Sequence, residues 1–568
     1  MTRSVRSQPR GRREEQLPLG SRIGVLRLRR VREYLTGYLM VAPAVILVFT
    51  FGIFPVGFAL YVSLQKWRLK RGDFLGLANF VSAVDTLAYV AAFALGIGAI
   101  IAAVLLLRRL WKDMQANQDK TWWLAIVGIL HALAVGSFVR WFVLLLPQVL
   151  DIADKIIGQV KTRELFSRLL GEAFRAESVL PAWYFFLISL ALSIGGYVIA
   201  SRTWRNPRNA PYQARFALSW LATGLGILLL VFTASQISAA YTAAFENGED
   251  PGIWPQIITI SSGILLLIAA WFVWRSAQAA DSNRGFWLKI VAAMTLLVGG
   301  WLLIGEIPVI VAAGDEDMWQ GLKNTIFYSA GTVPFQLSIS LFMAILLFQK
   351  LRGSEIFRMM FFLTYVTPTV ASAAVFRQLF SSRPSSLINQ IIMAFGLERQ
   401  FWLQEPAGIF TMIGEKLGFT VPEWAAGPSL ALVVIMIFSI WVYVGYDTVI
   451  YLAGLGNIST ELIEAAEIDG AGRWAVFRNV IFPLLSPTTY FLSLLAIIGT
   501  FKAFQHIWVL RHEFALRTTD TFSVTIFAEF FTKVRYGYAS ALAFVLFAII
   551  LSLTYLNNRI QGSRVFYG

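Results

Sequence analysis

Twelve long apolar segments constrain the fold of this chain more than any other feature of its sequence. Each is long enough for a helix that crosses a bilayer, which needs roughly 20 mostly apolar residues, and none shows the alternation of barrel strands. Because 57% of the residues are hydrophobic and 14% are charged, a water-soluble fold could not bury this much apolar surface. The sequence therefore predicts an all-α polytopic membrane protein with about 12 transmembrane helices. The segments occupy approximately residues 38–63, 88–108, 122–147, 183–200, 216–236, 254–274, 287–312, 323–349, 357–379, 428–453, 484–505 and 538–557.

Loop charges predict the orientation of these helices, because cytoplasmic loops are enriched in Lys and Arg. Segment 1–34 contains ten Arg residues and is longer than the basic region of a signal peptide, so we expect a retained, cytoplasmic N-terminus. The loops after the second, fourth, sixth and eighth spans are then basic and internal, whereas acidic loops at 246–250 and 315–317 are external. Four basic residues after the first span contradict this pattern: Lys66, Arg68, Lys70 and Arg71.

Several classes of site are excluded by composition. The chain contains no cysteine, which removes disulfides, thiol catalysis and cysteine-ligated metals. It contains only three histidines, so a histidine-rich metal site is not expected, and no catalytic or metal-binding residue is predicted. The phosphate-binding sequence Gly-x4-Gly-Lys-Ser/Thr does not occur, so ATP hydrolysis is not expected in this chain. The net charge of +15 is explained by Lys and Arg residues in the loops, where they set the orientation in the membrane. No nucleic-acid partner is therefore expected.

The loop between the tenth and eleventh spans has strong local signals. Residues 459–474 have the sequence STELIEAAEIDGAGRW, and Pro483 follows where the next span starts. Thr460 suits the N-cap of a short helix, and Gly470 and Gly472 suit its C-terminal end. The residues after these glycines are predicted to form a second short helix. The loop is therefore expected to be a rigid helix-turn-helix elbow on the cytoplasmic face.

Small and acidic side chains on the elbow suit docking to another protein. Ala465 and Ala466 allow a partner backbone to approach closely. Glu464 and Asp469 offer charge-assisted hydrogen bonds. An ordinary amphipathic helix beside the membrane is the alternative interpretation.

The spacing of these residues resembles the EAA loop of ABC importer permeases. The matching positions are Glu464, Ala465, Ala466, Gly470, Val480, Phe482 and Pro483. Val480 and Phe482 stand where the family usually has Ile and Leu. In that family the elbow inserts into a cleft on a separate nucleotide-binding subunit. The resemblance therefore implies that seven residues couple the spans to ATP hydrolysis elsewhere: Glu464, Ala465, Ala466, Asp469, Gly470, Gly472 and Pro483.

Other short stretches resemble the carbohydrate branch of that family, which includes the maltose and glycerol-phosphate systems. They are 35–38 with 43–44, 324–325, 357–358 with Pro368, 441–445, 452–455 and 536–541. Their order along the chain is that of the family. The resemblance implies the core of a type I ABC importer permease, interrupted by a large helical membrane insertion.

The resemblance divides the chain into four parts. Residues 1–34 are the basic cytoplasmic N-terminus, and 35–82 contain the first transmembrane helix and an outer loop. Residues 83–318 are an inserted bundle of about six transmembrane helices, and 319–568 are the permease core with the coupling loop at 458–487. Because six is even, the core re-enters from the same side and the elbow stays cytoplasmic. Scaffold, lipid contact and accessory-protein binding remain alternatives for the insertion.

The resemblance also implies partners and a location. We expect a second permease subunit, an ATP-binding subunit dimer, an extracytoplasmic solute-binding protein and a small-molecule substrate, in a prokaryotic inner membrane. ATP and Mg would be bound by the partner ATPase, with no cofactor in this chain. Both termini would be cytoplasmic, and import would proceed by alternating access.

Ionisable side chains inside membrane spans are candidates for function. Asp447 lies near Tyr443 and Tyr446 in the tenth span, and these three residues are predicted to line the substrate pathway. Sugar sites combine polar groups that bind hydroxyls with aromatic faces. Packing against a neighbouring helix is the alternative role for Asp447.

Four residues near the predicted outer face are interpreted as interfacial. Lys502 and His506 stand at the outer end of the eleventh span, where long side chains extend towards the lipid headgroups. Trp402 and Trp424 lie in the outer loop and are interpreted as interface anchors, with contact to a binding protein as the alternative.

Two other functions are alternatives to the importer. A polytopic membrane enzyme acting on lipid-linked sugars would require clustered acidic or histidine residues at one membrane face. An ion-coupled secondary transporter would predict inverted repeats and broken helices, and would leave the elbow unexplained.

Overall fold

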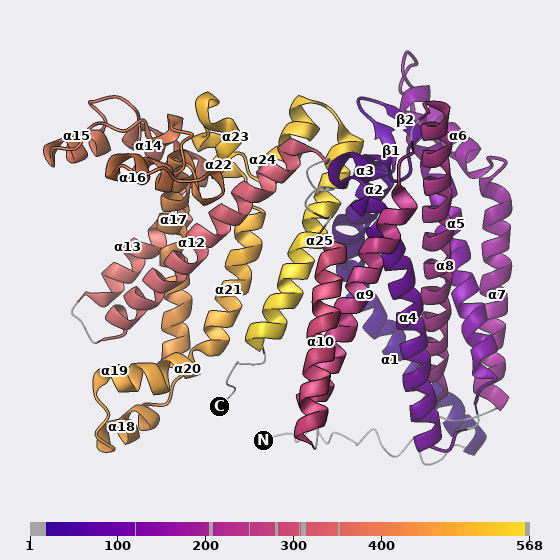
Figure 1. Cartoon of the computed structure of the whole chain (residues 1–568). Coiled ribbons are helices and arrows are strands. Elements are labelled where there is room, and N and C mark those ends of the chain that lie inside the picture. The colour runs from indigo at the N-terminus through magenta and orange to yellow at the C-terminus, as the bar shows by residue number, and fades with distance from the viewer. Residues whose placement is uncertain are drawn as a thin grey trace, which may run out of the picture. The chain divides into compact units, whose positions relative to one another are not determined.

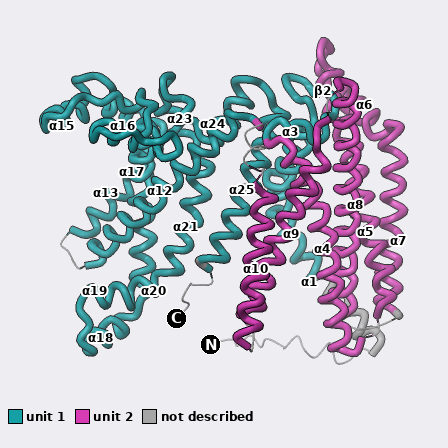
Figure 2. Tube along the Cα trace, in the orientation of Figure 1, with its two compact units in different colours: residues 1–83, 315–568 teal, residues 84–314 magenta. Residues whose placement is uncertain are grey.

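The computed structural model describes residues 19–119, 121–203, 208–248, 250–278, 282–305, 307, 314–349 and 353–562. Part of the predicted N-terminal segment (1–18) and Glu249 of the acidic loop lie outside the described residues. The chain separates into two compact units, 1–83 with 315–568 and 84–314 (Figure 2). The second unit has limits close to those predicted for the insertion.

The first unit contains the long helices α12, α17, α21 and α25 with shorter elements at both of their ends (Figure 1). Large apolar side chains of α12 and α17, with those of α22 and α24, form its main core. Its elements are α1 (Leu19–Val48), η2 (Phe49–Ile53), α2 (Phe54–Ser63), β1 (Gln65–Trp67), β2 (Arg71–Phe74), α3 (Ala78–Val84), α12 (Glu316–Phe348), α13 (Ser354–Val366), α14 (Thr369–Leu379), α15 (Leu387–Ala394), η3 (Trp402–Gln404), α16 (Ile409–Leu417), η4 (Glu423–Ala425), α17 (Leu430–Gly456), α18 (Thr460–Ile468), α19 (Arg473–Val476), η5 (Phe477–Ile481), α20 (Phe482–Leu484), α21 (Ser486–Phe501), α22 (Gln505–Leu510), η6 (Glu513–Ala515), α23 (Leu516–Thr519), α24 (Phe522–Phe527), η7 (Ala528–Thr532) and α25 (Tyr536–Gln561).

The second unit is a bundle of long helices whose backbones approach closely at glycines. A Cβ on Gly226 of α8 would lie 2.8 Å from the carbonyl oxygen of Gly96 on α4, and Gly300 of α10 faces Gly263 of α9 in the same way. Small residues at such crossings let helices pack in a membrane without large side chains between them. The elements are α4 (Leu87–Ala116), α5 (Leu124–Lys155), α6 (Arg163–Phe174), α7 (Val179–Thr203), α8 (Asn209–Glu246), α9 (Ile253–Gln278) and α10 (Asn283–Ile304).

The described residues contain 10 helices long and apolar enough to cross a membrane, or up to 12 if each of two bent pairs counts as one span. One bent pair corrects a prediction, because the span expected at 357–379 is broken into α13 and α14 with an angle of 94°. The break occurs at Pro368, where the preceding Thr367 has an extended backbone (φ −63°, ψ 141°). A residue before proline is disfavoured in the helical region, so the helix ends there.

Two π-helical turns each precede a proline by two residues. The turn η2 ends at Ile53 before Pro55, and η5 ends at Ile481 before Pro483. A proline inside a helix lacks the N–H donor and its ring collides with the carbonyl four residues earlier. A widened turn relieves that collision while the helix continues, so both prolines are accommodated without a break at that point.

The basic residues after the first span belong to a folded hairpin. Strands β1 and β2 pair antiparallel, and Asn79 of α3 donates hydrogen bonds to the carbonyls of Ser63 and Gln65. The hairpin packs closely on the start of α25, since a Cβ on Gly537 would lie 2.2 Å from the Gln65 carbonyl oxygen. Within the first unit, the hairpin lies at the end opposite α18 and α19 (Figure 1).

A buried carboxylate joins η7 to the start of α25. Glu529 is 1% exposed and accepts hydrogen bonds from Lys533 Nζ at 2.8 Å and Arg535 Nε at 2.6 Å. The bond with Glu529 raises the pKa of the Lys533 ammonium above its ordinary value. A buried charge of this kind is stable only when paired and hydrogen-bonded.

The loop between α14 and α17 is organised around one buried amide. Asn389 accepts hydrogen bonds from the indole N–H of Trp402 at 2.8 Å and from the backbone N–H of Gln400 at 3.0 Å. Trp402 also packs edge-on against Phe380. The indole N–H of Trp402 is therefore hydrogen-bonded within the loop, which corrects the interpretation of this residue as an interface anchor. Trp424, in contrast, is 86% exposed.

Candidate functional site

The elbow predicted between the tenth and eleventh spans consists of α18, α19, η5 and α20. Helix α18 begins at Thr460, and the N-cap is Ser459, which makes no side-chain capping bond. The expectation that Thr460 is the cap is therefore wrong by one residue. A cap must stand outside the helical conformation, and Ser459 has the extended backbone that this position requires (φ −60°, ψ 129°).

Gly470 ends α18 in a left-handed conformation, with φ +84°. The N–H of Ala471 donates to the carbonyl of Ala466, and the N–H of Gly470 donates to that of Glu467, which is the Schellman pattern. Gly472 has a different place from the one predicted. It is the N-cap of α19 with φ −70°, so it starts the second helix instead of ending the first.

Replacing Gly470 with alanine is expected to loosen the elbow, and Gly472→Ala is the matched control. A left-handed residue with a Cβ costs roughly 1–2 kcal/mol, whereas a Cβ on Gly472 would meet nothing within 4 Å. Amide hydrogen exchange across 460–471 should become about tenfold faster in Gly470→Ala, since tenfold corresponds to about 1.4 kcal/mol. Equal protection in the two variants would contradict the Schellman ending.

The surface of α18 is left open by the described part of the chain. None of its residues is buried, and Glu464, Ala465 and Asp469 are all exposed. Ile468 is 86% exposed, and Trp474 on α19 is 70% exposed. Small, acidic and apolar side chains thus share one surface that the described part of the chain leaves exposed.

The base of the elbow is firmly packed on the membrane helices. Leu455 of α17, Leu485 and Leu492 belong to one buried cluster with residues of α12. A Cβ on Gly454 would lie 2.6 Å from Thr488 Oγ1, so the end of α17 and the start of α21 nearly touch. The helix running from Arg473 to Leu484, which contains Pro483, meets α21 at 63°. A force on α18 would therefore reach α17 and α21 together.

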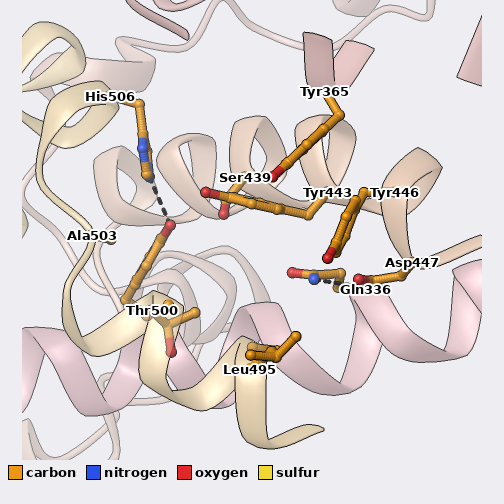
Figure 3. A pocket seen from close by; sticks show the side chains of 13 residues that line it. Gln336, Tyr365, Ser439, Tyr443, Tyr446, Asp447, Leu495, Thr500, Ala503 and His506 are labelled. Carbon is orange, nitrogen blue, oxygen red and sulfur yellow. Dashed lines mark hydrogen bonds between the residues drawn. The ribbon is translucent and has the colours of Figure 1, made fainter. Parts of the chain in front are cut away.

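The second feature of the first unit is a cavity of about 240 Å³. The pathway residues predicted on α17, Tyr443, Tyr446 and Asp447, all line it together with Ser439 (Figure 3). Their spacing of three, four and eight residues places them on one helix face. The structure thus brings the three predicted residues to one cavity, and their role in transport stays a prediction.

Helix α12 supplies the opposite wall, which sequence reasoning missed. Gln336 Nε2 donates a hydrogen bond to Asp447 Oδ2 at 2.6 Å, and Tyr328 lines the cavity two turns away. A signal for this wall was present, because polar residues recur every four positions in an otherwise apolar span. They are Asn324, Tyr328, Thr332, Gln336 and Ser340, and all are buried.

Tyrosines from two helices form an aromatic group at the cavity. Tyr365 of α13 stacks on Tyr446, with ring centroids 4.6 Å apart at 26°, and lies 5.9 Å from the ring of Tyr443. The packing requires Gly445, where a Cβ would lie 1.9 Å from the carbonyl oxygen of Phe361. Tyr365 gave no local signal, because its place depends on how α13 packs on α17.

His506 corrects another interpretation. It is 5% exposed, lines the cavity, and its Nε2 lies 2.7 Å from the hydroxyl of Tyr328 (Figure 3). Its ring points inward, because the chain turns after α21 and α22 directs the ring onto Phe438. Lys502 is the exposed C-cap of α21 and does not line the cavity.

Comparison with known proteins identifies the family. Residues 336–564 match the family described as "Binding-protein-dependent transport system inner membrane component". A probable ABC transporter permease protein of Pyrococcus horikoshii is 30% identical over 255 residues, which cover 44% of this chain and 79% of the relative. The chain belongs to this family of transport permeases.

Two further relatives of the permease are named for the substrate of their transport system. The lactose transport system permease protein LacF of Rhizobium radiobacter is 29% identical, covering 43% of this chain and 75% of the relative. The sn-glycerol-3-phosphate transport system permease protein UgpA of Rhizobium meliloti is 28% identical, covering 44% and 76%. The resemblance inferred from the elbow and the all-α polytopic fold are both confirmed.

The matched segment of the permease contains both features of the first unit. It includes the whole elbow and every cavity residue except Tyr328, whereas unit 84–314 lies outside it. Family membership favours the transport interpretation over the membrane enzyme and the ion-coupled transporter.

Proposed function

We propose that this permease is the membrane subunit of an ATP-driven, binding-protein-dependent importer that takes up a sugar or sugar derivative by alternating access. The observation that carries the proposal is the exposed, internally braced elbow with its Glu464-Ala465-Ala466 sequence and Gly470 turn. A separate ATPase that binds the elbow would be connected mechanically to the helices that line the cavity.

The proposed coupling follows from how the elbow is attached. Closure of an ATPase dimer displaces α18, and the close contacts at Gly454 and Leu485 pass the motion to α17 and α21. Helix α17 carries Tyr443, Tyr446 and Asp447, so its tilt changes the side from which the cavity is reached. Rigid packed helices transmit such motions because their interfaces have few alternative arrangements.

The proposed assembly contains a second permease, two ATP-binding subunits that hold ATP and Mg, and an extracytoplasmic binding protein. No cofactor is assigned to this chain. The elbow and both termini are placed on the cytoplasmic side of a prokaryotic inner membrane, as the loop charges favour.

A sugar cargo is supported by the relatives and by the cavity. The relatives named above carry lactose and glycerol phosphate in their names. Tyrosine rings and hydrogen-bonding side chains around one cavity suit a polyhydroxylated ligand, whose hydroxyls need partners and whose apolar face stacks on aromatics.

Photo-crosslinking from two equally exposed positions tests the assembly. Ile468 and Trp424 are both 86% exposed. Ile468 belongs to α18 and Trp424 follows α16 in the chain, and α16 and α18 lie at opposite ends of the first unit (Figure 1). With benzoylphenylalanine in place of either residue, we expect the ATP-hydrolysing subunit to be captured in native membranes from 468 and not from 424. A purified complex without nucleotide hydrolase, or capture of the hydrolase only from 424, would overturn the proposal.

A further inference from the structure

The charge of the cavity lining differs sharply from that of the chain. The protein contains 48 Lys and Arg residues and has a net charge of +15. Among the residues that the structure describes along the cavity, none is Lys or Arg. Lys502 is near in sequence to several lining residues, but it is exposed at the C-cap of α21 and does not line the cavity. An anion entering the cavity would therefore meet no Lys or Arg side chain.

Asp447 is the one carboxylate on this lining. It is 3% exposed, and Gln336 holds it with a single side-chain hydrogen bond of 2.6 Å. The opposite end of the cavity holds His506, whose Nε2 faces the Tyr328 hydroxyl (Figure 3). The remaining polar groups are hydroxyls, those of Tyr365, Ser439, Tyr443, Tyr446 and Thr500.

These groups treat neutral and anionic sugars differently. A neutral sugar exchanges bonds to water for bonds to hydroxyls, a carboxylate and an amide, and stacks against the tyrosines. A phosphate or carboxylate group loses its hydration without gaining a cationic partner, and is also repelled by a carboxylate across a medium less polar than water.

We infer that this cavity selects cargo by charge, admitting uncharged sugars and excluding phosphorylated or carboxylated ones, with Asp447 as the residue that determines this selectivity. The inference rests on the proposed function, since it assigns a substrate class to the same cavity. It separates this permease from its relative named for sn-glycerol-3-phosphate and groups it with the one named for lactose.

The absence of native cysteine permits a direct test of the cavity's charge. Gly499 lines the cavity, is exposed, and a Cβ placed on it meets nothing within 4 Å, so Gly499→Cys puts a thiol there without a steric conflict. The full chain, in its detergent-solubilised complex, is treated with three methanethiosulfonates of similar size. These are the uncharged hydroxyethyl, cationic trimethylammonioethyl and anionic sulfonatoethyl reagents, and the mass of the permease reports the rate.

The reference for intrinsic reactivity is Trp424→Cys, at an exposed position outside the cavity. The rate of each reagent at Gly499→Cys is divided by its rate at Trp424→Cys. We expect the cationic reagent then to react at least about ten times faster than the anionic one, the effect on this rate ratio of one unit charge nearby. Asp447→Asn in the same background should bring the ratio to within about twofold of one, and Asp447→Glu should retain it. The Glu variant distinguishes charge from a structural role.

Three results would overturn the inference. They are a ratio near one at Gly499→Cys, a ratio that Asp447→Asn leaves unchanged, and failure of even the uncharged reagent to reach the thiol. The measured quantity is the rate of thiol modification, which depends on neither transport nor ATP hydrolysis. The charge inference can therefore fail while crosslinking from Ile468 upholds the importer, and the reverse outcome is equally visible.

Discussion

Reversing one charge on the elbow, Glu464→Lys, is expected to abolish substrate-stimulated ATP hydrolysis while the permease remains in the membrane. Glu464 is exposed, and the described residues contain no ion pair to it, so the fold of this chain does not depend on its charge. Within a docked interface, loss of a buried charged contact costs about 2–5 kcal/mol. We expect ATP hydrolysis by the reconstituted complex to fall by more than about 30-fold, the equivalent of 2 kcal/mol.

Glu467→Lys is the matched control for that reversal. Glu467 is exposed on the same helix, lies outside the motif, and undergoes the same change of charge. A lysine near the C-terminus of α18 is favourable for the helix dipole, so the control does not weaken the helix. Unaltered transport by Glu464→Lys, or an equal loss in Glu467→Lys, would remove Glu464 from the coupling mechanism.

Gly445→Ala is expected to have the largest effect of any single substitution on the cavity itself. The added Cβ would lie 1.9 Å from the Phe361 carbonyl oxygen and 2.5 Å from its carbon, and neither is an atom that a side-chain rotation can move. Forcing apart packed elements typically costs about 1–3 kcal/mol. The melting temperature of the purified permease should fall. Transport should be lost because Tyr365 separates from Tyr446.

The control for this substitution is Gly456→Ala at the end of the same helix. A Cβ there meets nothing within 4 Å, so the variant should melt at or above the wild-type temperature. A wild-type melting temperature and wild-type transport in Gly445→Ala would show that α13 and α17 do not approach as described.

Much of the elbow was predictable because its signals are local. Gly470 takes a left-handed conformation that other residues avoid, and Pro483 restricts the helix around it, so the sequence indicates a turn between two short helices. The places of Thr460 and Gly472 were each misjudged, since caps depend on which residue leaves the helical region first. Those errors change helix boundaries and leave the elbow intact.

The cavity was only half predictable. Tyr443, Tyr446 and Asp447 share a helix face, and helical periodicity is enough to group them. Gln336 comes from more than a hundred residues earlier, and its bond to Asp447 exists only because α12 packs against α17. His506 illustrates the same limit, since its position in the chain suggested the membrane surface and packing turned it inward.

The sequence by itself determined the membrane class, the spans, the elbow and the family, because hydropathy over a span and backbone preferences at glycine and proline are properties of short segments. Only the tertiary structure decided that Trp402 bonds to Asn389 and which side chains enclose Asp447. Those outcomes depend on which helix faces meet. Apolar faces can pair in many ways with similar energy inside a bilayer, so close packing at small residues such as Gly445 selects among them.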